Sequence, residues 1–253
     1  MFDVAGKTTV ITGAAQGIGR EFALAFAKEG SKIVVTDING EKAESVAKEV
    51  ADAGGSAIAV QLDVTDLPAA EAMAKRAVDA FGSFDILINS AAIFSTIKMK
   101  PFYEMSIEEY RNVIDVNMAG TLIACKAAAP YMMDRQWGRI INLTSCSFFE
   151  GRGGYIHYVS SKAGVIGITR AVARELGGFN VTSNAIAPGA TVTEVPRETV
   201  NEEWKKKVMA NRCVQRTQIP QDLIGIALFM ASEEAGFMTG QTVVVDGGMI
   251  FLP

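Results

Sequence analysis

Short runs of apolar, β-branched residues alternate with longer helix-forming segments along the whole chain. This alternation is typical of a parallel sheet with helices on both faces, because parallel strands need long crossover connections. No linker or repeat interrupts it, and 253 residues suit one large domain better than two. We therefore predict a single-domain, doubly wound α/β fold spanning residues 1–253. The expected strands are Thr8–Thr12, Lys32–Asp37, Ala57–Asp63, Ile86–Asn89, Arg139–Leu143, Val181–Ala187 and Thr242–Asp246.

The charge balance and hydropathy of the chain exclude several function classes. With 24 Lys and Arg against 28 Asp and Glu, the net charge of −4 offers no basic surface to a nucleic acid. No segment approaches the ~20 apolar residues that cross a bilayer, and the start of the chain lacks the pattern of a secretory signal. We expect a cytoplasmic protein that acts on a small molecule, with no nucleic-acid or membrane partner.

The cysteines Cys125, Cys146 and Cys213 are widely spaced. They have neither the paired spacing of a zinc site nor the context of a disulfide framework. Cys146 as a nucleophile would depend on the single histidine, His157, as its base, and simple packing explains it better. We expect three buried free thiols and no metal site.

A glycine-rich loop, TGAAQGIG over 12–19, follows the first expected strand and opens a helix. Glycine lets the backbone approach a pyrophosphate closely, and the helix N-terminus presents unpaired N–H groups to its charge. The flanking strand and helix are the context that a dinucleotide-binding loop requires. The expected cofactor contacts in the loop are Gly13, Gln16, Gly17, Ile18 and Gly19.

Acidic residues at two strand ends indicate which dinucleotide is bound. Asp37 ends the second expected strand, where a carboxylate accepts hydrogen bonds from ribose hydroxyls and repels a 2′-phosphate. No basic residue stands at Ala14 or Ala15 to attract that phosphate. NAD is therefore expected rather than NADP, with Asp63 and Val64 contacting the adenine.

The set Ser145, Tyr158 and Lys162 carries the signal for catalysis. Tyr158 and Lys162 are four residues apart and share one face of a helix, where an ammonium can stabilise a phenolate. A free tyrosine titrates near pH ~10, and lowering its pKa by about three units takes roughly 4 kcal/mol. An ordinary amphipathic pair would explain Tyr158 and Lys162 alone. The glycine loop and Asn117 in the same chain favour a catalytic set.

On these residues the chain resembles the classical short-chain dehydrogenases/reductases over essentially its full length. The family's Thr-Gly-x-x-x-Gly-x-Gly loop matches the run that begins at Thr12, and the resemblance implies a Rossmann-type fold. It also implies that the catalytic residues are Asn117, Ser145, Tyr158 and Lys162. In the family the asparagine interrupts its helix and holds a water that links the lysine to solvent.

The resemblance implies further cofactor contacts beyond the glycine loop. The family's Pro-Gly element after the sixth strand falls on Pro188 and Gly189, with Thr191 and Thr193 facing the nicotinamide carboxamide. The usual Asn-Asn-Ala-Gly after the fourth strand departs from the family pattern, because it reads NSAA over 89–92. Asn89 keeps its sheet-stabilising place, and the final alanine narrows the space beside the cofactor.

Two larger-scale expectations follow from the same pattern. The segment 189–216 departs from the strand–helix alternation and is expected to form a substrate lid, although an ordinary surface helix explains it equally well. The resemblance implies a homotetramer built through two long helices, here those containing Asn112–Met133 and Tyr158–Leu176. Small residues on the second helix allow close approach of a partner, and burial within the monomer would also explain them.

The leading interpretation is an NAD-dependent oxidoreductase that interconverts a secondary alcohol and a ketone. Tyr158 removes the hydroxyl proton, Ser145 orients the oxygen, Lys162 lowers the tyrosine pKa and positions the ribose, and Asn117 supports the relay. An aromatic-rich wall suits an apolar cyclic or aromatic substrate, unless its members are core or interface residues. The expected wall residues are Phe94, Phe148, Phe149, Tyr155, Val195 and Trp204.

Two alternatives remain open at this point. A 3-oxoacyl-(acyl carrier protein) reductase has a chain of this shape, but Asp37 disfavours the NADPH that such enzymes typically use. A non-catalytic NAD-sensing regulator would bind the dinucleotide without chemistry. The complete set of Ser145, Tyr158 and Lys162 argues against a sensor, because a sensor does not need a tyrosine with a lowered pKa.

Overall fold

The computed structural model describes residues 2–196 and 202–252, with the side chains of Trp204 and Lys205 outside the description. Within these ranges a single parallel sheet has the strand order β3-β2-β1-β4-β5-β6-β7. This order confirms the doubly wound α/β prediction. The strands are β1 (Thr8–Thr12), β2 (Lys32–Asp37), β3 (Ser56–Gln61), β4 (Ile86–Asn89), β5 (Gly138–Leu143), β6 (Val181–Pro188) and β7 (Thr242–Val245).

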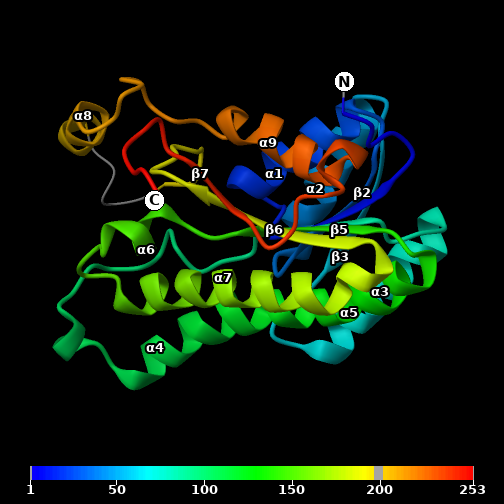
Figure 1. Ribbon diagram of the computed structural model, residues 1–253, viewed down its shortest axis with the longest axis horizontal. Helices are drawn as coiled ribbons and strands as arrows, with labels where there is room; N and C mark the ends of the chain where they lie inside the picture. Colours follow the sequence, from blue (N-terminus) through cyan, green and yellow to red (C-terminus); the bar gives the residue numbers. More distant parts are fainter. Residues whose placement is uncertain (1, 197–201, 253) are drawn as a thin grey trace.

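Helices cover both faces of this sheet. Figure 1 shows α1, α2 and α9 over one face and α3, α4, α5 and α7 over the other. The short α6 follows β5, and α8 lies in the segment between β6 and α9. Their bounds are α1 (Gly17–Lys28), α2 (Gly40–Asp52), α3 (Leu67–Phe81), α4 (Ile107–Ile114), α5 (Gly120–Arg135), α6 (Cys146–Glu150), α7 (Ile156–Leu176), α8 (Glu202–Ala210) and α9 (Gln221–Ala231).

The central strands are buried on both faces, which explains why they read as continuous apolar runs. Val10 and Leu87 belong to the cluster packed against α3 and α5, whereas Ile11 and Ile88 belong to the cluster packed against α1 and α9. This alternation follows from the two-residue period of a strand. The two helical layers therefore hold the carboxyl ends of the strands in fixed relative positions.

Local signals set several helix boundaries. The Oδ1 atom of Asp66 accepts a hydrogen bond from the N–H of Ala69 at 3.1 Å, with Pro68 in the first turn of α3. The Oγ atom of Ser106 accepts one from the N–H of Glu109 at 3.1 Å and starts α4. Each cap satisfies a donor that the helix itself leaves unpaired.

The long helix expected over Asn112–Met133 is divided in the structure. A π-helical turn, η2 (Asp115–Ala119), separates α4 from α5 and contains Asn117. The interruption at Asn117 that the family resemblance implies is therefore present. The second long helix was expected over Tyr158–Leu176 and is found as α7, which begins two residues earlier at Ile156.

Two sequence expectations need correction at the level of the fold. The third strand ends at Gln61 rather than Asp63, so Asp63 lies in the loop beyond β3, where its carboxylate bonds Thr65. Of the three cysteines, Cys125 and Cys146 are buried but Cys213 is exposed, because it lies in the irregular chain after α8. In the described part of the chain, no helix is long and apolar enough to cross a membrane.

Candidate active site

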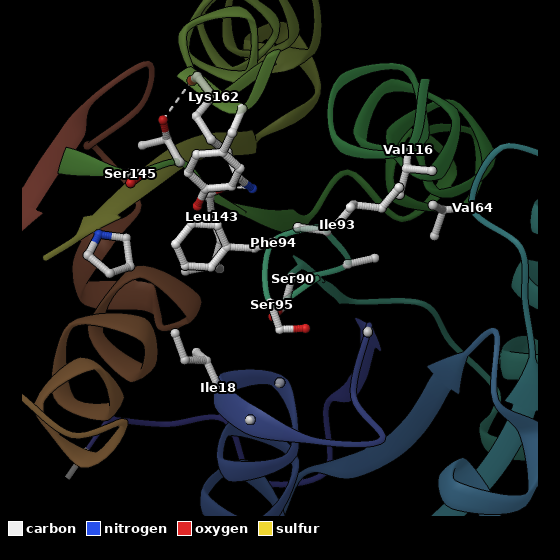
Figure 2. Close-up of a pocket in the computed structure, with 18 of the residues that line it drawn as sticks. Ile18, Val64, Ser90, Ile93, Phe94, Ser95, Val116, Leu143, Ser145 and Lys162 are labelled. Atoms are coloured by element: carbon white, nitrogen blue, oxygen red, sulfur yellow. Dashed lines mark hydrogen bonds between the residues drawn. The ribbon is translucent and has the colours of Figure 1, made fainter. Parts of the chain in front are cut away.

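A cavity of about 830 Å³ opens at the carboxyl ends of the strands, beside the reversal of strand order between β1 and β4. Figure 2 shows Ser145, Lys162 and Phe94 on one side of it, with Ile18 of α1 across from them. The residues expected from sequence that line this cavity are Gly13, Gln16, Gly17, Ile18, Gly19, Asp37, Asp63, Val64, Phe94, Ser145, Tyr155, Tyr158, Lys162, Pro188, Gly189, Thr191, Thr193 and Val195.

The glycine-rich loop brings the N-terminus of α1 to the cavity wall. Gly13 has a φ of +64°, and a Cβ atom there would lie 2.6 Å from the Cα atom of Ala91, so a larger residue does not fit. The N-cap residue Gln16 makes no capping hydrogen bond with its side chain. Instead, the N–H of Gly17 donates to Oε1 of Glu194 at 2.7 Å. A carboxylate thus already uses the helix N-terminus as an anion site, and the loop fits a dinucleotide phosphate.

Two carboxylates line the cavity where β2 and β3 end, and one of them, Asp37, lies against the glycine loop. Asp37 accepts hydrogen bonds from the N–H groups of Ala15 at 3.2 Å and Asn39 at 3.0 Å. Asp63 accepts from the N–H and the hydroxyl of Thr65, and these two bonds lower the pKa of Asp63. These bonds favour the charged form of the Asp63 carboxylate.

Ser145, Tyr158 and Lys162 meet in the cavity wall from two elements. Ser145 follows β5 and caps α6, where its Oγ atom accepts from the N–H of Ser147 at 3.1 Å. Tyr158 and Lys162 lie one turn apart on α7 and are 6% and 3% exposed. The Nζ atom of Lys162 lies 5.8 Å from the ring centroid of Tyr158 and donates to the carbonyl of Leu143 at 2.7 Å.

The Lys162 ammonium is held in an unfavourable environment. Burial lowers the pKa of Lys162 to about 8, because a low dielectric disfavours its charged form. At neutral pH the side chain is still mostly protonated. The fold therefore keeps a positive charge beside the phenol of Tyr158 at a cost to its own stability.

Two buried asparagines support this wall without lining the cavity. Asn117 accepts from the N–H of Ile93 at 2.7 Å and donates to the carbonyl of the same residue at 3.2 Å. Asn89 donates to Oδ1 of Asn142 at 2.8 Å, joining the ends of β4 and β5. Asn117 therefore fixes the loop after β4 against η2, and Asn89 fixes the neighbouring strands.

Three of the six candidate substrate residues line the cavity, and two of them, Phe94 and Tyr155, are aromatic. The ring of Phe94 stacks on Tyr158 with centroids 4.4 Å apart and lies 6.3 Å from the ring of Tyr155. Val195 lines the cavity from the segment after β6, close to Gly17 of the glycine loop. A flat apolar surface therefore adjoins the reactive phenol.

Two of the other candidate substrate residues lie outside the cavity, and the side chain of the third is not described. Phe148 and Phe149 do not line the cavity and pack against each other with centroids 5.0 Å apart. The reason is the short helix α6, which turns residues 146, 147 and 150 toward the cavity and the two phenylalanines away from it. The side chain of Trp204 lies outside the described part of the structure.

Sequence reasoning missed several charged or polar residues of the cavity. Glu150 and Arg152 line it from the segment between Ser145 and Tyr158, and Ser95 lines it from the loop after β4. The position of Arg152 between two predicted catalytic residues was a signal that could have identified it. The contact of Glu194 with the glycine loop spans 177 positions of sequence and had no local signal.

Comparisons with known proteins agree with this site. A family model described as enoyl-(acyl carrier protein) reductase matches residues 13–250. The chain is 41% identical over 250 residues to an uncharacterized oxidoreductase of Mycobacterium tuberculosis, covering 99% of both chains. It is 37% identical over 244 residues to a Staphylococcus aureus 3-oxoacyl-(acyl-carrier-protein) reductase, covering 96% of this chain and 98% of the relative.

A solved structure extends the likeness to three dimensions. A 7α-hydroxysteroid dehydrogenase in complex with NADH and 7-oxo glycochenodeoxycholic acid superimposes with a TM-score of 0.91 and 34% identity. The match covers 97% of this chain and 94% of that one. The family model, these relatives and the sheet order all point to one family. The chain belongs to the short-chain dehydrogenases/reductases, a family of oxidoreductases that bind a nicotinamide cofactor.

Proposed function

We propose that the protein is an NAD-dependent oxidoreductase that interconverts a secondary alcohol and a ketone. The observation that carries the proposal is the presence of Tyr158, Lys162 and Ser145 in the same cavity as the N-terminus of α1. This chemistry requires a phenol whose pKa is lowered by a nearby cation and a phosphate-binding loop in the same cavity. A regulator that only binds the dinucleotide would need the loop and not the phenol.

The residues divide the proton chemistry between them. NAD, when bound, supplies the acceptor for the hydride of the alcohol carbon. Tyr158 accepts the hydroxyl proton, and the buried ammonium of Lys162 stabilises the resulting phenolate. The Oγ atom of Ser145 accepts from Ser147, which leaves its own O–H free to donate to the substrate oxygen. Asn117 acts behind these groups as a positioning residue.

The cofactor preference rests on Asp37. Its carboxylate ends β2 at the cavity wall, and no cation replaces it in the glycine loop. A 2′-phosphate placed near this carboxylate would be repelled, whereas ribose hydroxyls would be bound. Steady-state kinetics with NAD and NADP on the same alcohol should give the higher kcat/KM with NAD. A higher value with NADP would overturn this part of the proposal.

The decisive test of the reaction is Tyr158→Phe. We expect kcat to fall by at least about 100-fold because the proton acceptor is lost, while the Kd for NADH stays near the wild-type value. The alcohols to assay are secondary aryl, alicyclic and polyol compounds, together with the corresponding ketones in the reverse direction. Unchanged turnover in the variant would exclude Tyr158. Tight NADH binding with no turnover of any substrate by the wild type would favour the sensor.

A second candidate is 3-oxoacyl-(acyl carrier protein) reduction. The Staphylococcus aureus reductase at 37% identity favours it, and Asp37 disfavours it if that reaction is to use NADPH. The aromatic surface formed by Phe94 and Tyr155 suits an apolar cyclic or aromatic substrate better than a flexible acyl chain. An acetoacetyl thioester assayed with NADPH and with NADH separates the two functions. Preferred turnover with NADPH would establish the reductase.

The quaternary structure and the lid belong to the same proposal. A Cβ atom at Gly164 would lie within 3 Å of Met118, so packing within the monomer explains that glycine. Gly167 is exposed, and a Cβ atom there would meet nothing within 4 Å, so close approach of a second copy at α7 is the better explanation. Light scattering should give the mass of a tetramer. We also propose 189–216 as the substrate lid; residues 197–201 of this segment lie outside the described structure, and the bridge between Thr191 and Gln218 lies near its start.

A further inference from the structure

Arg152 places a cation at the edge of the aromatic surface in the cavity. It follows α6, where its backbone N–H donates to the carbonyl of Ser147 at 3.1 Å. Its guanidinium carbon lies 5.1 Å from the ring centroid of Tyr155. Because Tyr155 adjoins Phe94, which stacks on Tyr158, an unbroken row of rings joins the guanidinium to the reactive phenol. A single small molecule lying along this row would contact both groups.

The charge of Arg152 has no protein counterpart. Among the described residues, Arg152 forms no ion pair, and the only other cation that lines the cavity, Lys162, bonds the carbonyl of Leu143. Tyr155 is 2% exposed, and its hydroxyl has no hydrogen-bond partner in the described part of the chain. Arg152 is half-buried and lines the cavity, so its guanidinium is available to a negatively charged ligand there.

We propose that Arg152 binds a carboxylate on the substrate. A guanidinium presents its N–H groups as a planar fork that matches the two oxygens of a carboxylate. Glu150 also lines the cavity and is unpaired among the described residues, so a group with two negative charges would be disfavoured relative to one with a single charge. The ligand is therefore a monoanion rather than a phosphate ester.

This assignment rests on the proposed alcohol–ketone chemistry and adds a substrate class to it. The substrate is a hydroxy acid, or the matching oxo acid, in which an apolar ring separates the reacting carbon from the carboxylate. The ring lies against Phe94 and Tyr155, the reacting oxygen reaches Tyr158, and the carboxylate reaches Arg152.

The test compares two probes that differ only in charge, para-acetylbenzoate and para-acetylbenzamide, bound to protein saturated with NADH. Calorimetry gives both Kd values for the wild type, Arg152→Gln, Arg152→Lys and the control Glu150→Gln. The wild type should prefer the benzoate about 10- to 100-fold, as charge-assisted hydrogen bonds predict. Arg152→Gln should abolish that preference, Arg152→Lys should keep part of it, and Glu150→Gln should keep or increase it. Equal NADH affinity in all four proteins confirms that each is folded.

In this design, binding tests the carboxylate site and turnover tests the proposed reaction, so each can be refuted without the other. Equal binding of the two probes by the wild type, including failure of both to bind at millimolar concentration, overturns the inference. A preference for the benzoate that survives Arg152→Gln overturns it as well. Turnover is then measured with the two corresponding secondary alcohols and NAD. A preference that depends on Arg152 without any turnover would leave the carboxylate site standing and refute the proposed reaction.

Discussion

Replacing Lys162 by Met should make activity very low at every pH, whereas its effect on the free energy of unfolding should change with pH. The wild-type side chain is 3% exposed and its pKa is lowered from 10.5 to about 8. Each unit of lowered pKa corresponds to about 1.4 kcal/mol, so the buried ammonium costs the folded state about 3 kcal/mol at neutral pH. The unfolded chain binds more protons than the folded chain between these two pKa values. Wild-type stability, measured relative to Lys162→Met, must therefore rise with pH in that window.

Urea unfolding of both proteins measures this difference. Between about pH 7 and about pH 10 the free energy of unfolding of the wild type, minus that of the variant, should increase by about 2 to 3 kcal/mol. The hydrogen bond from Lys162 to Leu143 is lost at every pH, so it shifts the difference by a constant and does not affect its slope. Activity of the variant should be very low throughout. A difference that is constant or falls with pH would refute the reasoning.

Three other changes test the cofactor end of the cavity. Glu194→Gln weakens the competition for the N–H of Gly17, so NADH affinity in a fluorescence titration should rise about two- to five-fold; weaker binding would contradict this. Gly13→Ala puts a methyl group 2.6 Å from the Cα of Ala91, so urea unfolding should show a loss of about 1 to 3 kcal/mol; wild-type stability would disprove the clash. Asp37→Ser should raise the kcat/KM ratio of NADP to NAD about 10-fold or more. An unaltered ratio would show that Asp37 does not determine the preference between NAD and NADP.

The sequence predicted those features that depend on local backbone demands. The positive φ of Gly13 and the narrow gap beside Ala91 require glycine whatever the rest of the chain does. The i, i+4 spacing of Tyr158 and Lys162 likewise decides that both face one side of α7. The strands were found because each is an apolar run between helical segments, and only their ends were uncertain by one or two residues.

Features that depend on distant or irregular segments could not be read from the sequence. Phe148 and Phe149 were expected at the substrate as members of an aromatic wall, yet the single turn of α6 rotates both away from the cavity. Whether so short a segment forms a helix depends on the Ser145 cap and on its surroundings rather than on propensity. Arg152 was overlooked because its loop has no periodicity from which a side-chain direction follows, although its position between Ser145 and Tyr158 was a signal that could have identified it.

The contact between Glu194 and Gly17 connects the proposed lid to the cofactor. Glu194 lies in the segment after β6, near Thr191, whose bridge to Gln218 anchors that segment. The N–H that its carboxylate accepts belongs to the helix N-terminus that would receive a dinucleotide phosphate. Two anions cannot share this donor, so a dinucleotide phosphate bound at Gly17, as proposed above, would displace Glu194 and release the start of the proposed lid from the glycine loop. By linkage, binding of the dinucleotide must first break this contact. The free energy that the contact contributes to the cofactor-free protein therefore makes the binding free energy of the dinucleotide less favourable by the same amount.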